Sequence, residues 1–127
     1  MATVRPDATP HVVPFVFALI REGTAIRLYW AVDAKPKRPT TLRRIENLRV
    51  NPAVEVVVDG YDDDWTALWW VRLRGTSRVV TSSEERRSAL AALASKYAPY
   101  RAIEPAGDVV AIDVDAVSWW AAGDALR

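Results

Sequence analysis

Six segments of the chain carry the alternation of apolar and polar side chains, or the β-branched apolar run, that is typical of strands. In the segment AIRLYWAV, residues 25–32, Ile26, Leu28 and Trp30 share one face. Arg27 and Tyr29 share the opposite face. The other predicted strands are residues 2–4, 11–20, 54–60, 67–80 and 109–120. Because the strands follow one another mostly through hairpin turns, the pattern predicts a mainly β fold, a six-stranded antiparallel barrel with two short helices.

Proline and glycine fall inside two of these strands and predict local irregularities. Pro14 cannot donate a hydrogen bond to a strand ladder, so we expect a bulge or an edge position in the segment 11–20. Gly75 is expected to bend the long strand 67–80.

The first predicted helix lies between the strands 25–32 and 54–60. Thr40 or Thr41 supplies a hydroxyl that can cap its start, and the pair Asn51-Pro52 stops it after about Val50. Its apolar side chains are expected to face the core: Leu42, Ile45 and Leu48.

The second predicted helix follows Ser82, which has the capping-box spacing with Glu85. We expect it to end near residues 98–99, where a proline follows an alanine. Its inward stripe is Leu90, Leu93, Ala94 and Tyr97.

Composition adds few constraints to this fold. The 127 residues suffice for one domain, residues 1–127, and 50% apolar with 26% charged residues is ordinary for a globular chain. The absence of cysteine excludes disulfides, a thiolate nucleophile and a cysteine metal site. No apolar run reaches the length of a membrane span and no signal-peptide pattern opens the chain, so we expect a cytoplasmic protein.

The charge is distributed unevenly, and this unevenness points to a binding site. The stretch KPKRPTTLRRIENLRVNP, residues 35–52, carries a net charge of +5 in a chain whose net charge is +1. Three interpretations remain open: a solvated helix face, a nucleic-acid surface and a site for an anionic small molecule. A pI near 8.1 lies below the value of about 9 that is typical of nucleic-acid-binding domains, and no nucleic-acid motif accompanies the basic stretch.

The small-molecule interpretation rests on what meets at the start of the first helix. The helix N-terminus offers unpaired N–H groups and a partial positive charge, and Pro36 and Pro39 stiffen the loop before it. Cationic and hydroxyl side chains gather there, which is the chemistry of a phosphate site: Lys35, Lys37, Arg38, Thr40 and Thr41.

Other candidate residues have simpler explanations. A single histidine, His11, cannot build a multi-histidine metal site, so no metal centre is predicted. The run Asp62–Asp64 lacks the ligand pattern of a calcium loop and fits a solvated turn. The six tryptophans are interpreted mainly as core or interface residues.

Three stretches carry a resemblance to a known family: ATVRPDATPHVVPFVFAL, YWAVDAKPKRPTTLRRIENLRVNPAVEVVVDGYDDDW and LWWVRLRGTSRV. Over nearly its whole length the chain resembles the split β-barrel flavin and deazaflavin oxidoreductases, the superfamily of pyridoxamine 5′-phosphate oxidase, and in particular their branch that depends on coenzyme F420. Relatives usually begin with a helix before the first strand, whereas here residue 2 is already in a predicted strand. Either the native chain is longer, or the end of the barrel is covered differently.

The resemblance implies a homodimer with one cofactor, F420, in each groove between the subunits. It also implies that the basic loop and helix start hold the phosphate of the cofactor, through Lys35, Lys37, Arg38, Thr40 and Thr41, with Arg43 as a weaker candidate. F420 carries an acidic oligoglutamate tail, so surplus cations are expected. His11 and Pro14 are placed near the ring, and Trp70 is a candidate wall for it.

The activity implied is hydride transfer between the deazaflavin and a small organic acceptor, with no nucleic-acid or membrane partner. FMN is the alternative cofactor, and a non-catalytic F420- or flavin-binding protein is the alternative function. No catalytic acid or base is assigned, and Tyr29 and His11 are the candidate proton donors.

Overall fold

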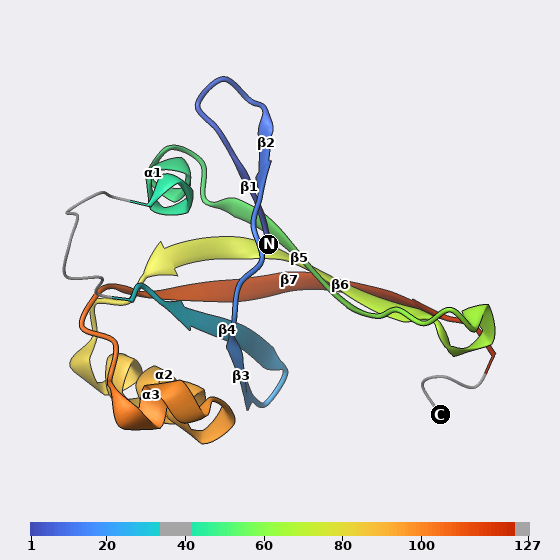
Figure 1. Ribbon diagram of the computed structural model, residues 1–127. Coiled ribbons are helices and arrows are strands. Elements are labelled where there is room, and N and C mark those ends of the chain that lie inside the picture. Colours follow the sequence, from blue (N-terminus) through green and yellow to red (C-terminus); the bar gives the residue numbers. More distant parts are fainter. Residues whose placement is uncertain (34–41, 124–127) are drawn as a thin grey trace.

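The computed structural model describes residues 1–33 and 42–123, which form one curled antiparallel sheet with helices around it (Figure 1). Within these ranges no helix is long and apolar enough to cross a bilayer. The helices are α1 (Arg43–Val50), α2 (Ser83–Lys96), α3 (Ala98–Ala102) and the 3₁₀ turn η1 (Trp65–Ala67). The strands are β1 (Ala2–Val4), β2 (Pro10–Val12), β3 (Ala18–Glu22), β4 (Ala25–Ala31), β5 (Ala53–Gly60), β6 (Trp69–Val79) and β7 (Val109–Ala121).

The short connection between β2 and β3 forces the sheet to close. The strand order is β2-β1-β5-β6-β7-β4-β3, so β2 and β3 lie at opposite edges. In a flat sheet these edges would be about 29 Å apart at ~4.8 Å per strand. The connecting residues 13–17 span at most about 20 Å. The sheet therefore curls into a barrel that is split between β2 and β3, and the predicted antiparallel β class is confirmed.

The predicted strand 11–20 is divided into β2 and β3, so the described residues form seven strands rather than six. The irregularity expected at Pro14 lies in the interruption, residues 13–17. Backbone groups there bond outside the ladders: the Val13 N–H donates to the Met1 carbonyl at 3.0 Å, and the Phe17 N–H donates to the Tyr97 hydroxyl at 3.2 Å. These bonds satisfy polar groups that would otherwise be unpaired.

The alternation predicted for the segment 25–32 is confirmed in β4. Leu28 and Trp30, 0% and 1% exposed, point into the barrel core. Tyr29 points to the other side of the sheet, where it packs in a second apolar cluster with residues of α2. Full burial of a side chain such as Leu28 contributes about 1.5–3 kcal/mol, so both layers stabilise the sheet.

α1 differs in part from its prediction. Its cap position is Leu42, which makes no side-chain cap bond, and the predicted capping residues Thr40 and Thr41 lie outside the described residues. Ile45 is buried as expected, but Leu42 is 37% exposed. The fully buried polar residue of this helix is Asn47, at 0% exposure.

α2 begins as predicted, and a further helix follows it. The Ser82 hydroxyl accepts a hydrogen bond from the Glu85 N–H at 3.2 Å. α2 ends at Lys96, and α3 starts at Ala98 with Pro99 in its first turn. Proline is well tolerated at this position of a helix because no intrahelical bond requires its missing N–H. The described residues therefore form three α-helices and one 3₁₀ turn, where two helices were predicted.

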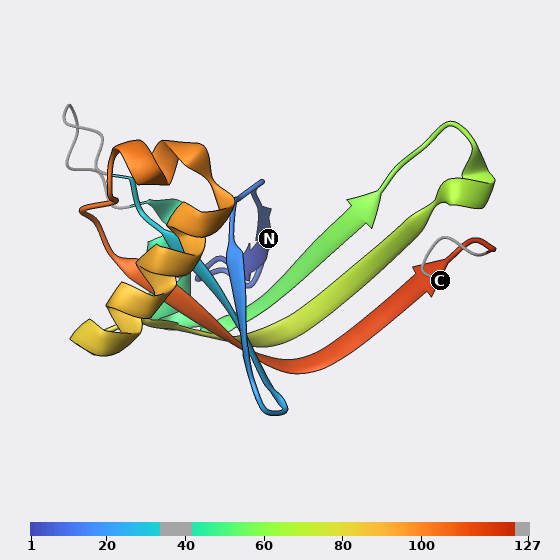
Figure 2. The ribbon, with the colours of Figure 1, turned by 90° about the horizontal axis from the view of Figure 1, so that it is seen from below.

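β5, β6 and β7 continue out of the barrel as a three-stranded ribbon (Figure 2), here called the arm: residues 55–60, 69–74 and 116–121. At the base of the arm, Val56 and Leu73 still belong to the barrel core. A register shift between Arg74 and Gly75 marks where the arm leaves the barrel, which confirms the expected bend. A Cβ at Gly75 would lie 2.4 Å from the Asp113 carbonyl oxygen, so only glycine fits there.

A network of charged side chains joins α2 to the outside of the sheet. The Arg78 guanidinium donates to the Glu85 carboxylate at 2.7 and 2.9 Å, and to the Asp113 carboxylate at 2.8 Å. The Tyr29 hydroxyl donates to Glu85 at 2.8 Å, and Arg27 donates to Asp113 at 3.1 Å. Hydrogen bonds from Arg78, above all, lower the pKa of Glu85 to about 2.

This network predicts how stability depends on pH. The pKa of Glu85 is depressed in the folded state, so its contribution is present above its ordinary pKa of 4.5 and is lost as the pH falls toward about 2. We expect Glu85→Gln to flatten the decline of the free energy of unfolding between these values, measured by urea denaturation at stepped pH. Asp113 contributes to the slope that remains, because Arg78 lowers its pKa too, and so do Asp7 and Asp64, whose pKa values are lowered by hydrogen bonds from Thr9 and Thr66. The control is the exposed neighbour Glu84→Gln, and equal slopes in both variants would contradict the assignment.

Candidate functional site

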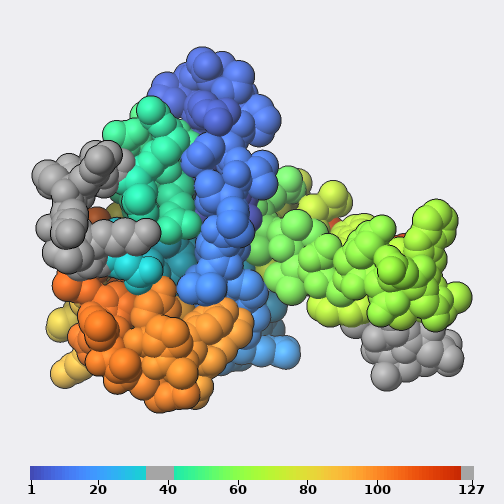
Figure 3. All heavy atoms as spheres, viewed as in Figure 1, coloured from blue at the N-terminus to red at the C-terminus, as the bar shows by residue number. Residues whose placement is uncertain are grey.

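A cavity of about 190 Å³ opens where the end of β4, the start of α1, α3 and the segment 13–17 come together. Figure 3 shows α1, α3 and the chain between β2 and β3 bordering this region of the surface. The lining residues are Pro14, Phe15, Val16, Trp30, Ala31, Asp33, Arg44 and Tyr100.

Arg44 lies over the indole of Trp30, with its guanidinium carbon 4.4 Å from the ring centroid. Such a cation–π contact is worth about 0.5–2 kcal/mol and fixes the side chain at the cavity. Burial lowers the pKa of Arg44, and the nearby Asp33 carboxylate acts in the opposite direction. Among the described residues Arg44 forms no ion pair within 4.0 Å. A half-buried positive charge without a contacting acid is thus available to a ligand.

Two further polar groups belong to residues that line the cavity: the Tyr100 phenol and the Trp30 indole N–H. Burial raises the pKa of the Tyr100 phenol, and the charge and hydrogen bond of Asp33 raise it further. Trp30 is 1% exposed, and its buried Nε1 has no hydrogen-bond partner among the described residues. Facing these groups is an apolar wall from the segment 13–17, of which Pro14 is a member.

The start of α1 adds backbone donors beside Arg44. The Ile45 and Glu46 N–H groups bond the Leu42 carbonyl, whereas the N–H groups of Arg43 and Arg44 precede any intrahelical acceptor. Unpaired amides at a helix start favour anions. The cavity is therefore suited to an anionic group attached to an apolar body.

The residues predicted for phosphate contact cannot be placed in this geometry. Lys35, Lys37, Arg38, Thr40 and Thr41 lie outside the described residues. The segment that carries them joins β4 to α1, and both of these elements contribute to the lining.

The four remaining predicted residues lie in four different places. Pro14 lines the cavity. Arg43 is on the exposed face of α1, 3.1 Å from the Glu46 carboxylate. Trp70 is on the arm, where its ring lies 5.4 Å from the Arg72 guanidinium carbon. Sequence reasoning missed Arg44. The i, i+3 spacing of Arg43 and Glu46 was a signal in the sequence that could have found Arg44. This spacing predicts an ion pair for Arg43 and leaves Arg44 next to the apolar side chains of the helix.

His11 belongs to a buried polar cluster under α1. Its Nδ1 lies 3.4 Å from the Asn47 amide nitrogen, which donates to the Thr3 hydroxyl at 2.9 Å. Neither candidate proton donor lines the cavity, because Tyr29 is hydrogen-bonded to Glu85 on the α2 side of the sheet. Among the described residues no group of His, Cys, Asp and Glu side chains is arranged to hold a metal ion.

The fold and the matched sequence establish the family. A model of the pyridoxamine 5′-phosphate oxidase family matches residues 1–121. The chain therefore belongs to the pyridoxamine 5′-phosphate oxidase family, whose split barrel the topology reproduces. The comparison with curated proteins found no match.

Several solved structures share this fold at low sequence identity. A conserved hypothetical protein from Mycobacterium tuberculosis has a TM-score of 0.70 and 22% identity over 94% of this chain and 74% of its own. The heme storage protein HutZ from Vibrio cholerae has a TM-score of 0.68 and 14% identity, covering 98% and 86%. An FAD-binding protein from Mesorhizobium loti has a TM-score of 0.58 and 19% identity, covering 93% and 81%. At these identities the likeness shows the fold alone.

The buried cluster under α1 leads to a prediction about stability. Asn47→Ala removes the donor to Thr3 and leaves a buried hydroxyl unpaired, so we expect the free energy of unfolding to fall by about 1–3 kcal/mol. Thermal or urea unfolding measures this change. Asn51→Ala is the matched control, because Asn51 only accepts an exposed bond from the Ala53 N–H at the helix end. An Asn47 variant no less stable than the Asn51 variant would contradict the prediction.

Proposed function

We propose that this chain is an oxidoreductase that uses coenzyme F420 and transfers a hydride between the deazaflavin and a small organic acceptor. The observation that carries the proposal is Arg44, held half-buried over Trp30 at a cavity beside the first amides of α1, which have no hydrogen-bond partner among the described residues. The strongly basic segment 35–41 directly precedes this helix in the sequence. Together they provide an excess of positive charge for an anionic cofactor.

The residues present fit the anionic end of such a cofactor. Arg44 and the amides at the start of α1 would hold a phosphate, with Lys35, Lys37, Arg38, Thr40 and Thr41 contributing from the segment outside the described residues. The apolar wall that contains Pro14 and Phe15 offers a surface for a flat ring. When bound, reduced F420 supplies a hydride to the acceptor.

The chain's own residues bind and orient in this proposal. Arg44 fixes the anion because Trp30 restricts the rotation of its guanidinium group. The half-buried Phe15 shields one side of the cavity from water. No side chain is assigned a proton transfer.

The size of the cavity supports a site shared between two subunits. A volume of about 190 Å³ lies below the range of about 300–1,000 Å³ that is typical of sites enclosing a whole small ligand. A second copy of the chain would supply the missing contacts. The arm offers a surface for such a copy on the face of Trp119, which is 63% exposed. We therefore include a homodimer in the proposal.

FMN remains the alternative cofactor, supported by the shared fold of the FAD-binding protein. The non-catalytic alternative predicts tight cofactor binding without hydride transfer to any acceptor. Absorption spectra after loading distinguish the cofactors, since F420 and FMN have different bands.

Two adjacent arginines, Arg43 and Arg44, allow the anion site to be tested. We expect Arg44→Gln to weaken F420 binding at least tenfold, because a charge-assisted hydrogen bond is worth about 1.5–3 kcal/mol. Arg43→Gln should change it less than about twofold, because an exposed salt bridge such as Arg43–Glu46 contributes about 0–1 kcal/mol and lies off the cavity. Lys37→Ala is expected to weaken binding at least tenfold while leaving the fold intact. Titration followed by tryptophan quenching gives the dissociation constants.

Arg44→Lys keeps the charge and serves as the control for folding and for electrostatics. We expect it to recover part of the lost affinity. Equal affinities for the wild type, Arg44→Gln and Lys37→Ala would remove the cavity and the basic segment from the site. Preference for FMN in the same titrations would instead favour the alternative cofactor.

A substitution on the arm tests the proposed homodimer. Trp119→Glu places a charge on the apolar surface of the arm, so we expect sedimentation to show monomers and cofactor affinity to fall with dimer content. Ile103→Glu is the control, since this residue is 78% exposed but lies beyond α3. A wild-type chain that sediments as a monomer while binding F420 tightly would contradict the shared site.

A further inference from the structure

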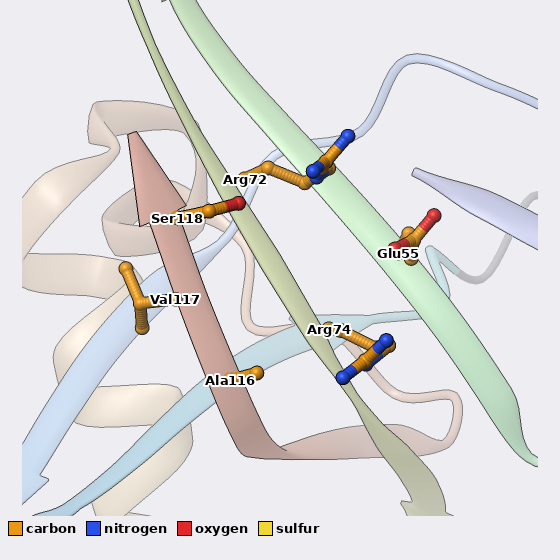
Figure 4. Close-up of a pocket in the computed structure, with 6 residues that line it drawn as sticks. All are labelled: Glu55, Arg72, Arg74, Ala116, Val117 and Ser118. Carbon is orange, nitrogen blue, oxygen red and sulfur yellow. The ribbon is translucent and has the colours of Figure 1, made fainter. Parts of the chain in front are cut away.

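A second hollow lies on the arm, on the face that carries the arginines of β6. Its volume is about 230 Å³ (Figure 4). The residues that line it are Glu55, Arg72, Arg74, Ala116, Val117 and Ser118. None of them lines the cavity at Arg44.

The pairing of the strands explains the hollow. Arg72 pairs with Ser118, and Arg74 pairs with Ala116, so two long side chains on β6 stand beside two short ones on β7. Figure 4 shows both arginines projecting to the same side of β6, with the Ser118 hydroxyl pointing toward Arg72. The small side chains leave space for a ligand within reach of both guanidinium groups.

The charge of this hollow favours an anion. Two guanidinium groups face one carboxylate, Glu55, which pairs with Arg74 in the strand register. Within the described part of the chain neither Arg72 nor Arg74 has a carboxylate oxygen within 4.0 Å. Guanidinium groups bind carboxylate and phosphate through paired N–H donors, and Ser118 adds a hydroxyl donor.

An aromatic surface lies next to the arginines. Trp70 and Trp120 pair across β6 and β7, directly beyond Arg72 and Ser118. The guanidinium carbon of Arg72 is 5.4 Å from the centroid of Trp70, and Trp120 is 46% exposed. A flat ring can pack on such indoles while its charged group reaches the arginines.

We propose that this face of the arm is a second ligand site, which binds a small aromatic molecule carrying a phosphate or carboxylate group. Arg72, Arg74 and Ser118 bind the anionic group, and Trp70 and Trp120 contact the ring. The site does not depend on the proposed cofactor, because it shares no lining residue with the cavity at Arg44.

The experiment titrates the full chain with phenyl phosphate, benzoate, inorganic phosphate and the neutral analogue benzyl alcohol. Indole ¹H–¹⁵N signals of Trp70 and Trp120, assigned with single Trp→Phe variants, report binding locally. We expect phenyl phosphate or benzoate to shift both signals, and the stronger of the two identifies the anionic group. Inorganic phosphate should bind at least fivefold more weakly, and benzyl alcohol should cause no shift.

Variants separate this site from the first cavity. We expect Arg72→Gln/Arg74→Gln to weaken binding at least tenfold and Trp120→Ala to weaken the aromatic ligands but not inorganic phosphate. Arg87→Gln, on the exposed surface of α2, and Arg44→Gln should leave the affinity unchanged, whatever becomes of F420 binding. The proposal is overturned if the wild type shows no shift, if the double variant binds as the wild type does, or if Arg44→Gln abolishes the shift.

Discussion

The closure of the sheet by residues 13–17 is the constraint on which the rest of the structure depends. Because this segment is too short to cross a flat seven-stranded sheet, it draws the two edges together and creates the barrel interior. Three of these residues, Pro14, Phe15 and Val16, form the apolar wall of the cavity. The geometry that closes the fold therefore also shapes the candidate site, and changes to one are expected to affect the other.

The helices after β6 support this segment from outside. The Lys96 ammonium and the Tyr97 hydroxyl both donate to the Phe17 carbonyl, at 2.8 and 3.0 Å. Tyr100, three residues further, reaches the cavity. α2 is itself tied to the sheet by the charged network around Arg78. A continuous set of contacts thus links the charged network around Arg78 to the wall of the cavity.

The sequence predicted the strands well because their side-chain alternation depends only on which face is buried. β4 and the cap of α2 are examples, since Leu28, Trp30 and Ser82 act as their local patterns indicate. The extent of the interruption in the segment 11–20 could not be predicted, because it depends on hydrogen bonds between Phe17 and two distant residues, Lys96 and Tyr97. The burial of Asn47 was missed for a related reason: its partner Thr3 is distant in sequence.

At the candidate site, the sequence led to the prediction of an anion site but did not single out Arg44. The basic segment and the helix start led to the prediction of an anion site, and Pro14, which was predicted near the cofactor ring, lines the cavity at Arg44. Choosing between Arg43 and Arg44, which lie on α1, required the position of Trp30, which belongs to β4. Neighbouring residues on a helix differ by about 100° in direction, so a small rotation of α1 decides which arginine lines the cavity.

The register shift at Gly75 has a consequence for the two surfaces of the arm. In the barrel, Val110 and Ile112 of β7 face the core, so even-numbered residues point inward. Past the shift, Val117 and Trp119 pair with Leu73 and Val71, which belong to the core side of the sheet. There the odd-numbered residues of β7 lie on the core side. Asp115 is the unmatched residue that changes the parity. A deletion of this one amino acid would exchange the positions of Trp119 and Trp120, so a change of chain length, without any change of side-chain chemistry, would give the arm a different pair of faces.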